Sequence, residues 1–513
     1  MNHLHFIGIG GIGMSGLAAM CRDHGMRVTG SDRGADRPEN ARIIDALRNQ
    51  KIEIFPQDGS FIAAGRPDAI VYSTAIEEDN PDWTAAGGIP RLHRSELLEH
   101  MLETCGFGTT IAVTGSCGKS TVTAYLAEAL TNLGLDPCCL NGALSNRFHS
   151  GRFAGNYRSG SREYFVFEAD ESDKSLLHYS PDYALVLNIG TDHYDREELA
   201  RVFAGFLGRV RRGAVLERGV YEAVREKIPP HLDVRVFDAK PRRDSRYAVT
   251  DYRKVERPEA IYTHGRRSEL APTGDRAVDD LYGANNALSI YGLRSEDFRI
   301  ASTEFLAEFN GEKHLVLPQP GFHTALNALA VYAMLDLLGV GTDEERLASL
   351  ERFDGVWRRN DFAGITPKGT PVYDDYAHNP EKILSCLSAM RELAPGRIYA
   401  VFQPHGYKPF GFMRDELFER LDGFLTRRDR FILLEPFYAG GTSSFSPSAQ
   451  EVAADWKSRS RSPERFMVFP DRETLADFLT LKPGAGDVIV IMGARDNSLS
   501  DYAKSLTREI AAP

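Results

Sequence analysis

The chain has 513 residues, a length that corresponds to about three domains at roughly 150 residues each. It is 42% hydrophobic and 26% charged, which excludes both a single small module and a wholly disordered chain. Lys and Arg number 61 against 72 Asp and Glu, so the net charge of -11 argues against general binding of nucleic acid or of an anionic membrane.

The N-terminus and the cysteines indicate the compartment. The first residues contain neither a cationic leader nor a small-residue cleavage site, and no apolar run is long enough to span a bilayer. The six cysteines form no CxxC pair, which is typical of a reducing environment. We therefore expect a cytoplasmic protein, either a monomer or a homodimer, that binds small molecules.

Short apolar runs recur along the chain, and most of them are followed by a helical pattern. This alternation predicts an α/β fold with mostly parallel sheets. The predicted strands lie within residues 4–10, 68–75, 109–116, 164–172, 183–193, 370–378, 398–406, 430–438 and 487–494. Breaks in the pattern divide the chain into domains at 1–105, 106–355 and 356–513, and the Arg-rich stretch 240–290, which has few strand signals, reads as an atypical insertion in the middle domain.

The first predicted strand ends in a glycine-rich run, Gly8-Ile9-Gly10-Gly11-Ile12-Gly13, that opens a helix. Asp32 follows about 20 residues later, as in a dinucleotide-binding fold where an acidic residue meets a ribose hydroxyl. Such a run alone is weak evidence for a dehydrogenase, and no hydride-transfer site follows it. We interpret it as a site for a substrate that carries a nucleotide.

The strongest local motif is the loop from Thr114 to Ser120, TGSCGKS, which joins an apolar strand to a helix. Its glycines allow backbone N–H groups to surround a phosphate at the helix N-terminus, where the helix dipole favours anions. Lys119 supplies a positive charge, and Ser120 supplies a hydroxyl for Mg²⁺. The loop is shorter than the common GxxxxGK[ST] form and could be a plain glycine-rich turn, but its context predicts ATP binding.

Two later strand ends carry candidate metal ligands. One has Glu168, Asp170, Glu171 and Asp173, and the other has Asp192, His193 and Asp195. Carboxylate oxygens suit Mg²⁺, and a neutral imidazole can serve a second metal. The alternative interpretation is a capped helix followed by a solvated turn, and the neighbouring phosphate loop favours the metal sites.

Taken together, these blocks resemble the Mur ligases, a family of ATP-dependent enzymes that join amino acids to a UDP-linked muramic acid in peptidoglycan synthesis. The resemblance follows the chain in order through HFIGIGGIGMSGLA, VYSTAI, RSELL, TGSCGKST, EADESD, NIGTDH, LPQPGFHTALNALA, VWRRNDF, VYDDYAHNP, FQPHGY and LEPFYAGG. It implies an N-terminal Rossmann-like UDP-binding domain, a central P-loop ATPase domain and a C-terminal Rossmann-like domain. It also implies the cofactors ATP and Mg²⁺.

The N-terminal blocks are most similar to the family members that add L-alanine to UDP-N-acetylmuramate through an acyl phosphate. This resemblance implies that the UDP-linked substrate meets Gly10, Gly11, Ile12, Asp32 and Ser73. It implies that ATP meets Thr114, Gly115, Ser116, Cys117, Gly118, Lys119, Ser120, Thr121, Asn327, Arg359 and Asp375. The implied metal ligands are Ser120, Glu168 and His193, and the implied catalytic residues are Lys119, Glu168, His193, Arg359 and Asp375. The incoming amino acid is expected to meet His378, His405 and Lys408.

The sequence departs from the family pattern at several of these positions. Cys117 stands where the alanine-adding members usually have His, and Thr324 stands where they have Asn. Gly406 and Pro409 replace arginines expected near the carboxylate of the amino acid, which leaves Lys408 as a candidate cation and leaves the identity of the added amino acid open. Two alternatives therefore stay open: a ligase that recycles a murein tripeptide, and a non-catalytic relative that binds ATP and a UDP-sugar.

Overall fold

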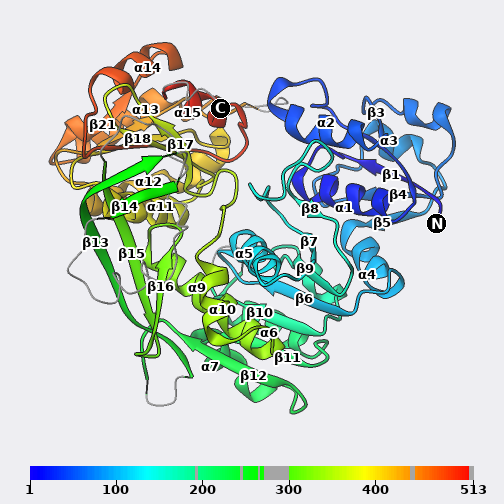
Figure 1. Cartoon of the computed structure of the whole chain (residues 1–513). Coiled ribbons are helices and arrows are strands. Elements are labelled where there is room, and N and C mark those ends of the chain that lie inside the picture. Colours follow the sequence, from blue (N-terminus) through cyan, green and yellow to red (C-terminus); the bar gives the residue numbers. More distant parts are fainter. Residues whose placement is uncertain (191–193, 243–245, 264–265, 271–299, 439–444, 508–513) are drawn as a thin grey trace. The chain divides into compact units, whose positions relative to one another are not determined.

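A computed structural model of the chain describes residues 1–190, 194–242, 246–263, 266–270, 300–438 and 445–507 (Figure 1). The chain forms two compact units, and each is described by itself. The first contains Met1–Tyr252, Ala307–Leu317 and His323–Trp357, and the second contains Arg253–Leu306, Pro318–Phe322 and Arg358–Pro513. Among the described residues, no helix has the length and apolar character that a membrane crossing requires.

The first unit begins with a five-stranded parallel sheet that confirms the predicted strands near residues 4–10 and 68–75. From edge to edge its strands are β3 (Glu53–Phe55), β2 (Arg27–Ser31), β1 (His3–Ile7), β4 (Ala69–Tyr72) and β5 (Arg91–His93). The helices of this part are α1 (Ile12–Asp23), η1 (Pro38–Asn40), α2 (Ala41–Asn49), η2 (Ser60–Ala64), α3 (Pro81–Ala85) and α4 (Arg94–Thr104). Strand β1 is buried along its whole length, and its two histidines, His3 and His5, both lie within hydrogen-bond distance of the hydroxyl of Thr29.

The central sheet has eleven strands, and most of the pairings between its neighbouring strands are parallel. The order is β16 (Lys313–Leu317), β15 (Ile300–Phe309), β13 (Tyr247–Thr263), β12 (Asp233–Asp238), β11 (Gly213–Glu217), β10 (Tyr183–Val186), β6 (Thr109–Thr114), β9 (Tyr164–Glu168), β7 (Cys138–Leu140) and β8 (Tyr157–Arg158), with β14 (Arg266–Leu270) paired to β13. The helices are α5 (Lys119–Asn132), η3 (Ser175–His178), α6 (Arg196–Leu207), α7 (Arg218–Val224), η4 (Arg225–Lys227), α9 (Phe322–Leu338) and α10 (Asp343–Leu350). Strand β6 lies between β10 and β9, so the polar residues that follow these three strands gather at one edge of the sheet.

The interpretation of residues 240–290 as a stretch with few strands is wrong for the part that the structure describes. The 17-residue strand β13 continues the sheet beside β12, and β14 pairs with it in antiparallel fashion. Charged residues such as Asp251, Arg253 and Lys254 interrupt the apolar residues of β13 and conceal it from a search for apolar runs. Residues 271–290 lie outside the described residues.

The second unit contains a six-stranded sheet. Its order is β17 (Asp361–Ile365), β18 (Pro371–Asp375), β22 (Val488–Met492), β19 (Ile398–Phe402), β20 (Arg430–Leu433) and β21 (Phe466–Val468), and all neighbours are parallel except β17 and β18. The helices are α11 (Pro380–Leu393), α12 (Tyr407–Phe424), α13 (Ala449–Arg459), η5 (Pro463–Arg465), α14 (Arg472–Leu481) and α15 (Ser498–Ser505). Three α/β sheets, each mostly parallel, therefore confirm the predicted fold class.

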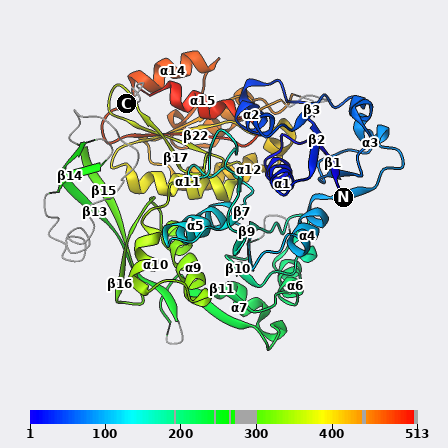
Figure 2. The same ribbon diagram turned by 45° about the vertical axis from the view of Figure 1, so that its right-hand side comes forward.

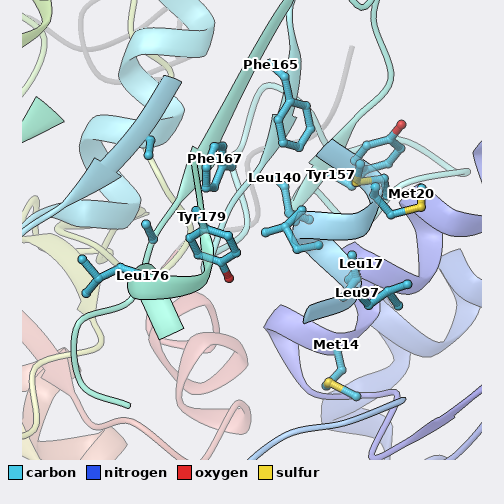
Figure 3. Close-up of a cluster of buried hydrophobic side chains, with 14 of the residues drawn as sticks. Met14, Leu17, Met20, Leu97, Leu140, Tyr157, Phe165, Phe167, Leu176 and Tyr179 are labelled. Carbon is cyan, nitrogen blue, oxygen red and sulfur yellow. The ribbon is translucent and has the colours of Figure 1, made fainter. Parts of the chain in front are cut away.

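Within the first unit, one hydrophobic core continues from the first sheet into the central sheet. Helix α1 lies beside β8, and helix α4 lies beside η3, the short helix that follows β9 (Figures 1 and 2). Figure 3 shows the shared side chains, which are Met14, Leu17, Met20, Leu97, Leu140, Tyr157, Phe165, Phe167, Leu176 and Tyr179. Their burial holds the glycine-rich loop in a fixed position relative to the central sheet.

Polar contacts reinforce this packing at helix α1. Asn156 donates from its side-chain amide to the carbonyl of Ile12 at 2.6 Å and to the hydroxyl of Ser15 at 2.8 Å. A Cβ atom at Gly16 would lie only 2.9 Å from Leu140 Cδ1. The glycine at position 16 is therefore required for close packing between the two sheets.

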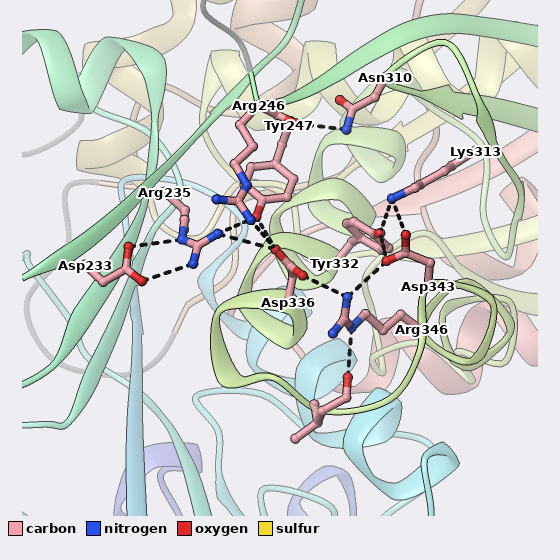
Figure 4. A network of polar contacts seen from close by, with 11 residues as sticks. Asp233, Arg235, Arg246, Tyr247, Asn310, Lys313, Tyr332, Asp336, Asp343 and Arg346 are labelled. Carbon is pink, nitrogen blue, oxygen red and sulfur yellow. Dashed lines mark hydrogen bonds and ion pairs between the residues drawn. The ribbon is translucent and has the colours of Figure 1, made fainter.

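A network of charged side chains ties α9 and α10 to the strands of the central sheet (Figure 4). Asp336 on α9 pairs with Arg346 at 2.8 Å, with Arg246 at 3.2 Å and with Arg235 at 3.6 Å. Lys313 pairs with the carboxylate of Asp343 at 2.7 Å. Because these groups are partly exposed, their ion pairs orient the two helices and contribute little to the free energy of unfolding.

The helix that follows the phosphate loop, α5, carries a buried acid. Glu128 accepts a hydrogen bond from the hydroxyl of Ser145 at 3.1 Å and another from the backbone N–H of Asp354 at 2.9 Å. Burial raises the pKa of Glu128 to about 8, from an ordinary value of 4.5. The folded protein therefore holds a proton on Glu128 at pH values where the unfolded chain does not.

This burial predicts a specific pH dependence of stability. Between about pH 4.5 and pH 8 the native state binds one more proton than the unfolded chain, so the contribution of Glu128 to the free energy of unfolding falls as the pH rises. In the Glu128→Gln variant the amide can accept from the N–H of Asp354 and donate to the hydroxyl of Ser145. As the pH rises from 5 to 8, we expect the free energy of unfolding to fall less in this variant than in the wild type, by on the order of 4 kcal/mol at most. Urea unfolding at pH 5 and pH 8 measures the difference. The exposed Glu226→Gln variant is the control, and equal pH slopes in all three proteins would contradict the prediction.

Candidate active site

The phosphate loop has the backbone conformation that its glycines predict. Gly115 has a φ of 137° and Gly118 a φ of 85°, both in the region that disfavours other residues. A Cβ atom at Gly115 would also lie 3.1 Å from the backbone nitrogen of Asn188. Helix α5 begins at Lys119, so the loop leads directly into a helix N-terminus, as an anion site requires.

Asn188, which follows β10, holds this loop and was not identified from the sequence. Its side-chain oxygen accepts from the backbone N–H of Cys117 at 2.8 Å, and its amide donates to the carbonyl of Cys117 at 2.9 Å. The hydroxyl of Ser116 accepts from the N–H of Gly190 at 2.8 Å. These bonds use the main chain of Cys117, and nothing in the structure explains its departure from the family residue. The only sequence signal was an amide at the end of the strand beside the phosphate loop.

Lys119 lies among the acidic residues that follow β9. Its ammonium donates to the carboxylate of Glu171 at 2.6 Å and to the carbonyl of Gly115 at 3.0 Å, and it lies 3.7 Å from Asp170. Burial acts to lower the pKa of Lys119, but the charges of Glu171 and Asp170 outweigh it and raise that pKa above its ordinary value. Lys119 is therefore a stable cation at neutral pH.

Arg94, the first residue of α4, provides a second cation that was not identified as a site residue from the sequence. It lies 3.3 Å from Asp173 and 3.6 Å from Asp170. A Cβ atom at Gly13 would lie only 2.7 Å from the Arg94 guanidinium, so the glycine-rich loop makes room for this side chain. Burial acts to lower the pKa of Arg94, and the charges of Asp173 and Asp170 raise it overall. Arg94 therefore joins the first loop to the acidic residues of the central sheet.

A cavity of about 160 Å³ lies beside Arg94 and Asp170. The first sheet and its helices contribute Gly13, Leu17 and Arg94 to its wall, and the central sheet contributes Asn141, Glu168 and Asp170. Both apolar and charged groups line it, which suits a ligand that carries an acidic group on a partly apolar frame.

The four acidic residues at the end of β9 and directly after it do not form one metal site. No group of three or more His, Cys, Asp or Glu side chains within the described part of the chain is arranged to hold a metal. Asp170, Glu171 and Asp173 pair with Lys119 and Arg94, whereas Glu168 accepts from the N–H of Gly142 at 2.9 Å.

The residues around Glu168 nevertheless fit a magnesium ion. Asn141 donates from its amide to the carbonyl of Ser120 at 3.1 Å, while its side-chain oxygen is buried and has no hydrogen-bond partner among the described residues. A hydroxyl, a carboxylate and an amide oxygen are hard donors, and Mg²⁺ is commonly held by few protein groups together with substrate phosphates. His193 lies outside the described residues, so its predicted metal role stays a prediction.

In the first sheet, Asp32 supports the glycine-rich loop. Its carboxylate accepts from the N–H of Gly10 at 2.8 Å and from the N–H of Gly34 at 2.7 Å. A Cβ atom at Gly10 would lie 2.8 Å from that carboxylate, which explains the glycine at this position. Gly11 is exposed and Ile12 is partly exposed, so the N-terminus of α1 is accessible to a ligand.

Two other predicted residues of the first unit lie near these loops. Ser73 directly follows β4 and is partly exposed. Asn327 on α9 lies beside the phosphate loop, because a Cβ atom at Gly118 would be 3.4 Å from its side-chain oxygen. The structure therefore brings Asn327 to the predicted nucleotide site.

The predicted residues Arg359 and Asp375 belong to the second unit. Asp375 is buried, and its carboxylate accepts from the backbone N–H groups of Asn360 at 2.7 Å and Ala377 at 2.8 Å. Burial raises the pKa of Asp375, although the charge of Arg359 acts to lower it. The guanidinium of Arg359 lies 5.1 Å from the ring centroid of Tyr376. Asp375 thus supports the local backbone, and its role toward a nucleotide stays a prediction.

His378 and His405 come together, as expected of residues around one site. Their ring centroids are 5.3 Å apart with the rings at 80°. Nδ1 of His378 lies 2.9 Å from the carbonyl oxygen of Tyr376, and burial lowers the pKa of His378 to about 4. Lys408, in the first turn of α12, is exposed.

The chain matches models of three Mur ligase domains. The model described as "Mur ligase family, catalytic domain" matches residues 3–104, "Mur ligase middle domain" matches residues 113–211, and "Mur ligase, glutamate ligase domain" matches residues 358–495.

Among solved structures, the fold is similar to the UDP-N-acetylmuramate-alanine ligase of Thermotoga maritima, with a TM-score of 0.71, 24% identity and coverage of 98% of each chain. It is also similar to a murein peptide ligase of Psychrobacter arcticus, with a TM-score of 0.62, 21% identity and coverage of 100% of each chain.

Curated relatives align along almost the entire chain. The UDP-N-acetylmuramate--L-alanine ligase of Chelativorans sp. is 30% identical over 99% of this chain and 98% of its own length. The enzyme of the same name from Agrobacterium fabrum is 32% identical over 99% of this chain and 96% of its own. With three matching domain models and relatives of this identity over its full length, the chain belongs to the Mur ligase family.

Proposed function

We propose that the chain uses ATP to join L-alanine to the lactyl carboxylate of UDP-N-acetylmuramate, releasing ADP and phosphate, as a step of peptidoglycan precursor synthesis. The observation that carries this proposal is the cavity between the first and central sheets. It is lined by Gly13 of the first loop and by Glu168 and Asp170, and Asp170 also lies beside Lys119. The full-length relatives that carry this name support the same reaction.

The first loop would bind the diphosphate of the UDP group. The start of α1 at Ile12, next to exposed Gly11, offers the N–H groups of the first helical turn and the positive end of a helix dipole. Asp32 acts through Gly10, since its carboxylate already binds that N–H. Ser73 stays a predicted contact of the uridine.

Lys119 would reduce the repulsion between the substrate carboxylate and ATP. Two unit anions at 4 Å repel by about 4 kcal/mol at an effective dielectric constant of 20. A phosphate at the loop would compete with Glu171 and Asp170 for the ammonium of Lys119, which these carboxylates keep protonated. Magnesium held by Ser120 and Glu168 would add neutralising charge at the phosphate oxygens.

The proposed reaction has two steps. An oxygen of the lactyl carboxylate bonds to the γ-phosphorus of ATP as the bond to ADP breaks, which gives an acyl phosphate. The amine of L-alanine then attacks the carbonyl carbon, phosphate leaves, the amine loses a proton, and an amide remains. Lys119 would stabilise the negative charge that develops in both steps. Arg359 and Asp375 stay predicted nucleotide contacts, and the nucleotide substrates indicate a cytoplasmic reaction.

The function is tested by an assay that follows phosphate release and product mass together. The protein is supplied with ATP, Mg²⁺ and UDP-N-acetylmuramate, and with L-alanine, other single amino acids or the murein tripeptide in separate reactions. We expect the product mass of the L-alanine adduct and one phosphate per product. A product only with the tripeptide would support the recycling ligase, and no new mass in any reaction would support the non-catalytic alternative.

The Lys119→Ala variant tests whether the phosphate loop and the first loop bind different substrates. We expect turnover to fall by about 100- to 1,000-fold or more, because charge stabilisation at the transferred phosphate is lost. Binding of UDP-N-acetylmuramate, measured by calorimetry, should be largely unchanged because Lys119 lies on the phosphate loop and not on the first loop. Lys174→Ala is the control, since Lys174 is a lysine of the same unit that lies outside the phosphate loop and pairs with Glu198 at 2.7 Å. Equal loss of turnover and of UDP-substrate binding in Lys119→Ala would contradict this division.

A further inference from the structure

Three loops meet at the carboxyl edge of the sheet in the second unit. Strand β22 lies between β18 and β19 and is parallel to both, so the segments that follow these strands are neighbours. Residues 376–379 follow β18 and carry His378, and residues 403–406 follow β19 and carry His405. The segment between them, after β22, carries Arg495.

Hydrogen bonds from Arg358 hold the segment that carries Arg495. The guanidinium of buried Arg358 donates to the carbonyl of Gly493 at 2.6 Å and to that of Asp496 at 3.1 Å. A Cβ atom at Gly493 would lie 2.9 Å from the carbonyl oxygen of Gln403, which shows how closely the segments after β22 and β19 approach each other. The backbone on both sides of Arg495 therefore has a fixed position.

The side chain of Arg495 is exposed and makes no hydrogen bond or ion pair with any residue that the structure describes. Its charge nevertheless acts on His405, because burial and Arg495 together lower the pKa of that imidazole. Nδ1 of His405 is buried and has no hydrogen-bond partner within the described parts of the chain. Arg495 thus lies on the loop between the two loops that carry the imidazoles, with its donors available.

The charges around the histidine pair are positive. Burial is the main cause of the low pKa of His378, and Lys382 and Arg359 lower it further. Both imidazoles are therefore neutral at pH 7, and neither supplies a full positive charge. Two neutral imidazoles, together with an unpaired guanidinium on the neighbouring loop, suit a ligand with a carboxylate and an amine.

We propose that Arg495 binds the carboxylate of the amino acid that the enzyme adds. This inference rests on the proposed function and names the cation of its amino-acid site. It accounts for the absence of arginines at positions 406 and 409, because a guanidinium on the loop after β22 supplies the fork that Gly406 and Pro409 cannot. Lys408 is the rival cation, and it is a point charge without a fork.

Steady-state kinetics of Arg495 variants test this assignment. We expect the KM for L-alanine to rise in the order wild type, Arg495→Lys, Arg495→Ala, Arg495→Glu, with an increase of about 10- to 100-fold for Arg495→Ala. The KM values for ATP and UDP-N-acetylmuramate should stay unchanged. A purely structural role for Arg495 would not order the variants by charge or spare the other two substrates.

Two further variants complete the test. Arg461→Ala, the removal of another exposed arginine of the same unit, should leave all KM values unchanged. Lys408→Ala should raise the KM for L-alanine less than Arg495→Ala does. The inference is wrong if the wild type is active and the Arg495 variants keep its KM for the amino acid, or if Lys408→Ala has the larger effect. A wild type that adds no amino acid refutes the proposed function itself, so the two failures are distinguishable.

Discussion

The packing of helices α1 and α4 against the central sheet is the interaction on which the site depends. Met14, Leu17 and Leu97 share one core with the strands that flank the phosphate loop, and Asn156 fixes the first turn of α1. The distance between the glycine-rich loop and the phosphate loop is therefore fixed, although the two loops belong to different sheets. A cavity with both loops near its wall follows directly from this packing, and so does the proposal that a nucleotide-bearing acid reacts there.

The charges at this cavity are balanced among themselves. Lys119 and Arg94 would each be costly to bury alone, and Asp170 lies within ion-pair distance of both of them. Asp170 also shows the effect in its own pKa, which burial acts to raise but which the charge of Lys119 lowers overall. The acidic residues after β9 thus hold two cations in place where phosphate and carboxylate groups are expected to bind.

Much of the fold could be predicted from the sequence because its strands are buried on both faces and end in distinctive polar residues. The phosphate loop could also be predicted, because Gly115 and Gly118 have backbone conformations that require glycine and therefore leave a pattern in the sequence. Three residues were not identified because each acts through a contact that only the fold creates. They are Asn188, Arg94 and Arg358, the arginine that holds the segment after β22. The glycine-rich motif was recognised, but not the packing role of Gly16, whose neighbour Leu140 is far away in sequence. Strand β13 was missed because charged residues interrupt its apolar ones.

Transfer of oxygen tests the proposed chemistry most directly. UDP-N-acetylmuramate labelled with ¹⁸O at both oxygens of its lactyl carboxylate is incubated with the protein, ATP, Mg²⁺ and L-alanine, and the released phosphate and the product are analysed by mass spectrometry. If the carboxylate attacks the γ-phosphorus, each phosphate carries one ¹⁸O atom and the other remains in the new amide. Release of unlabelled phosphate, or the appearance of ¹⁸O in AMP, would contradict an acyl-phosphate reaction at this cavity.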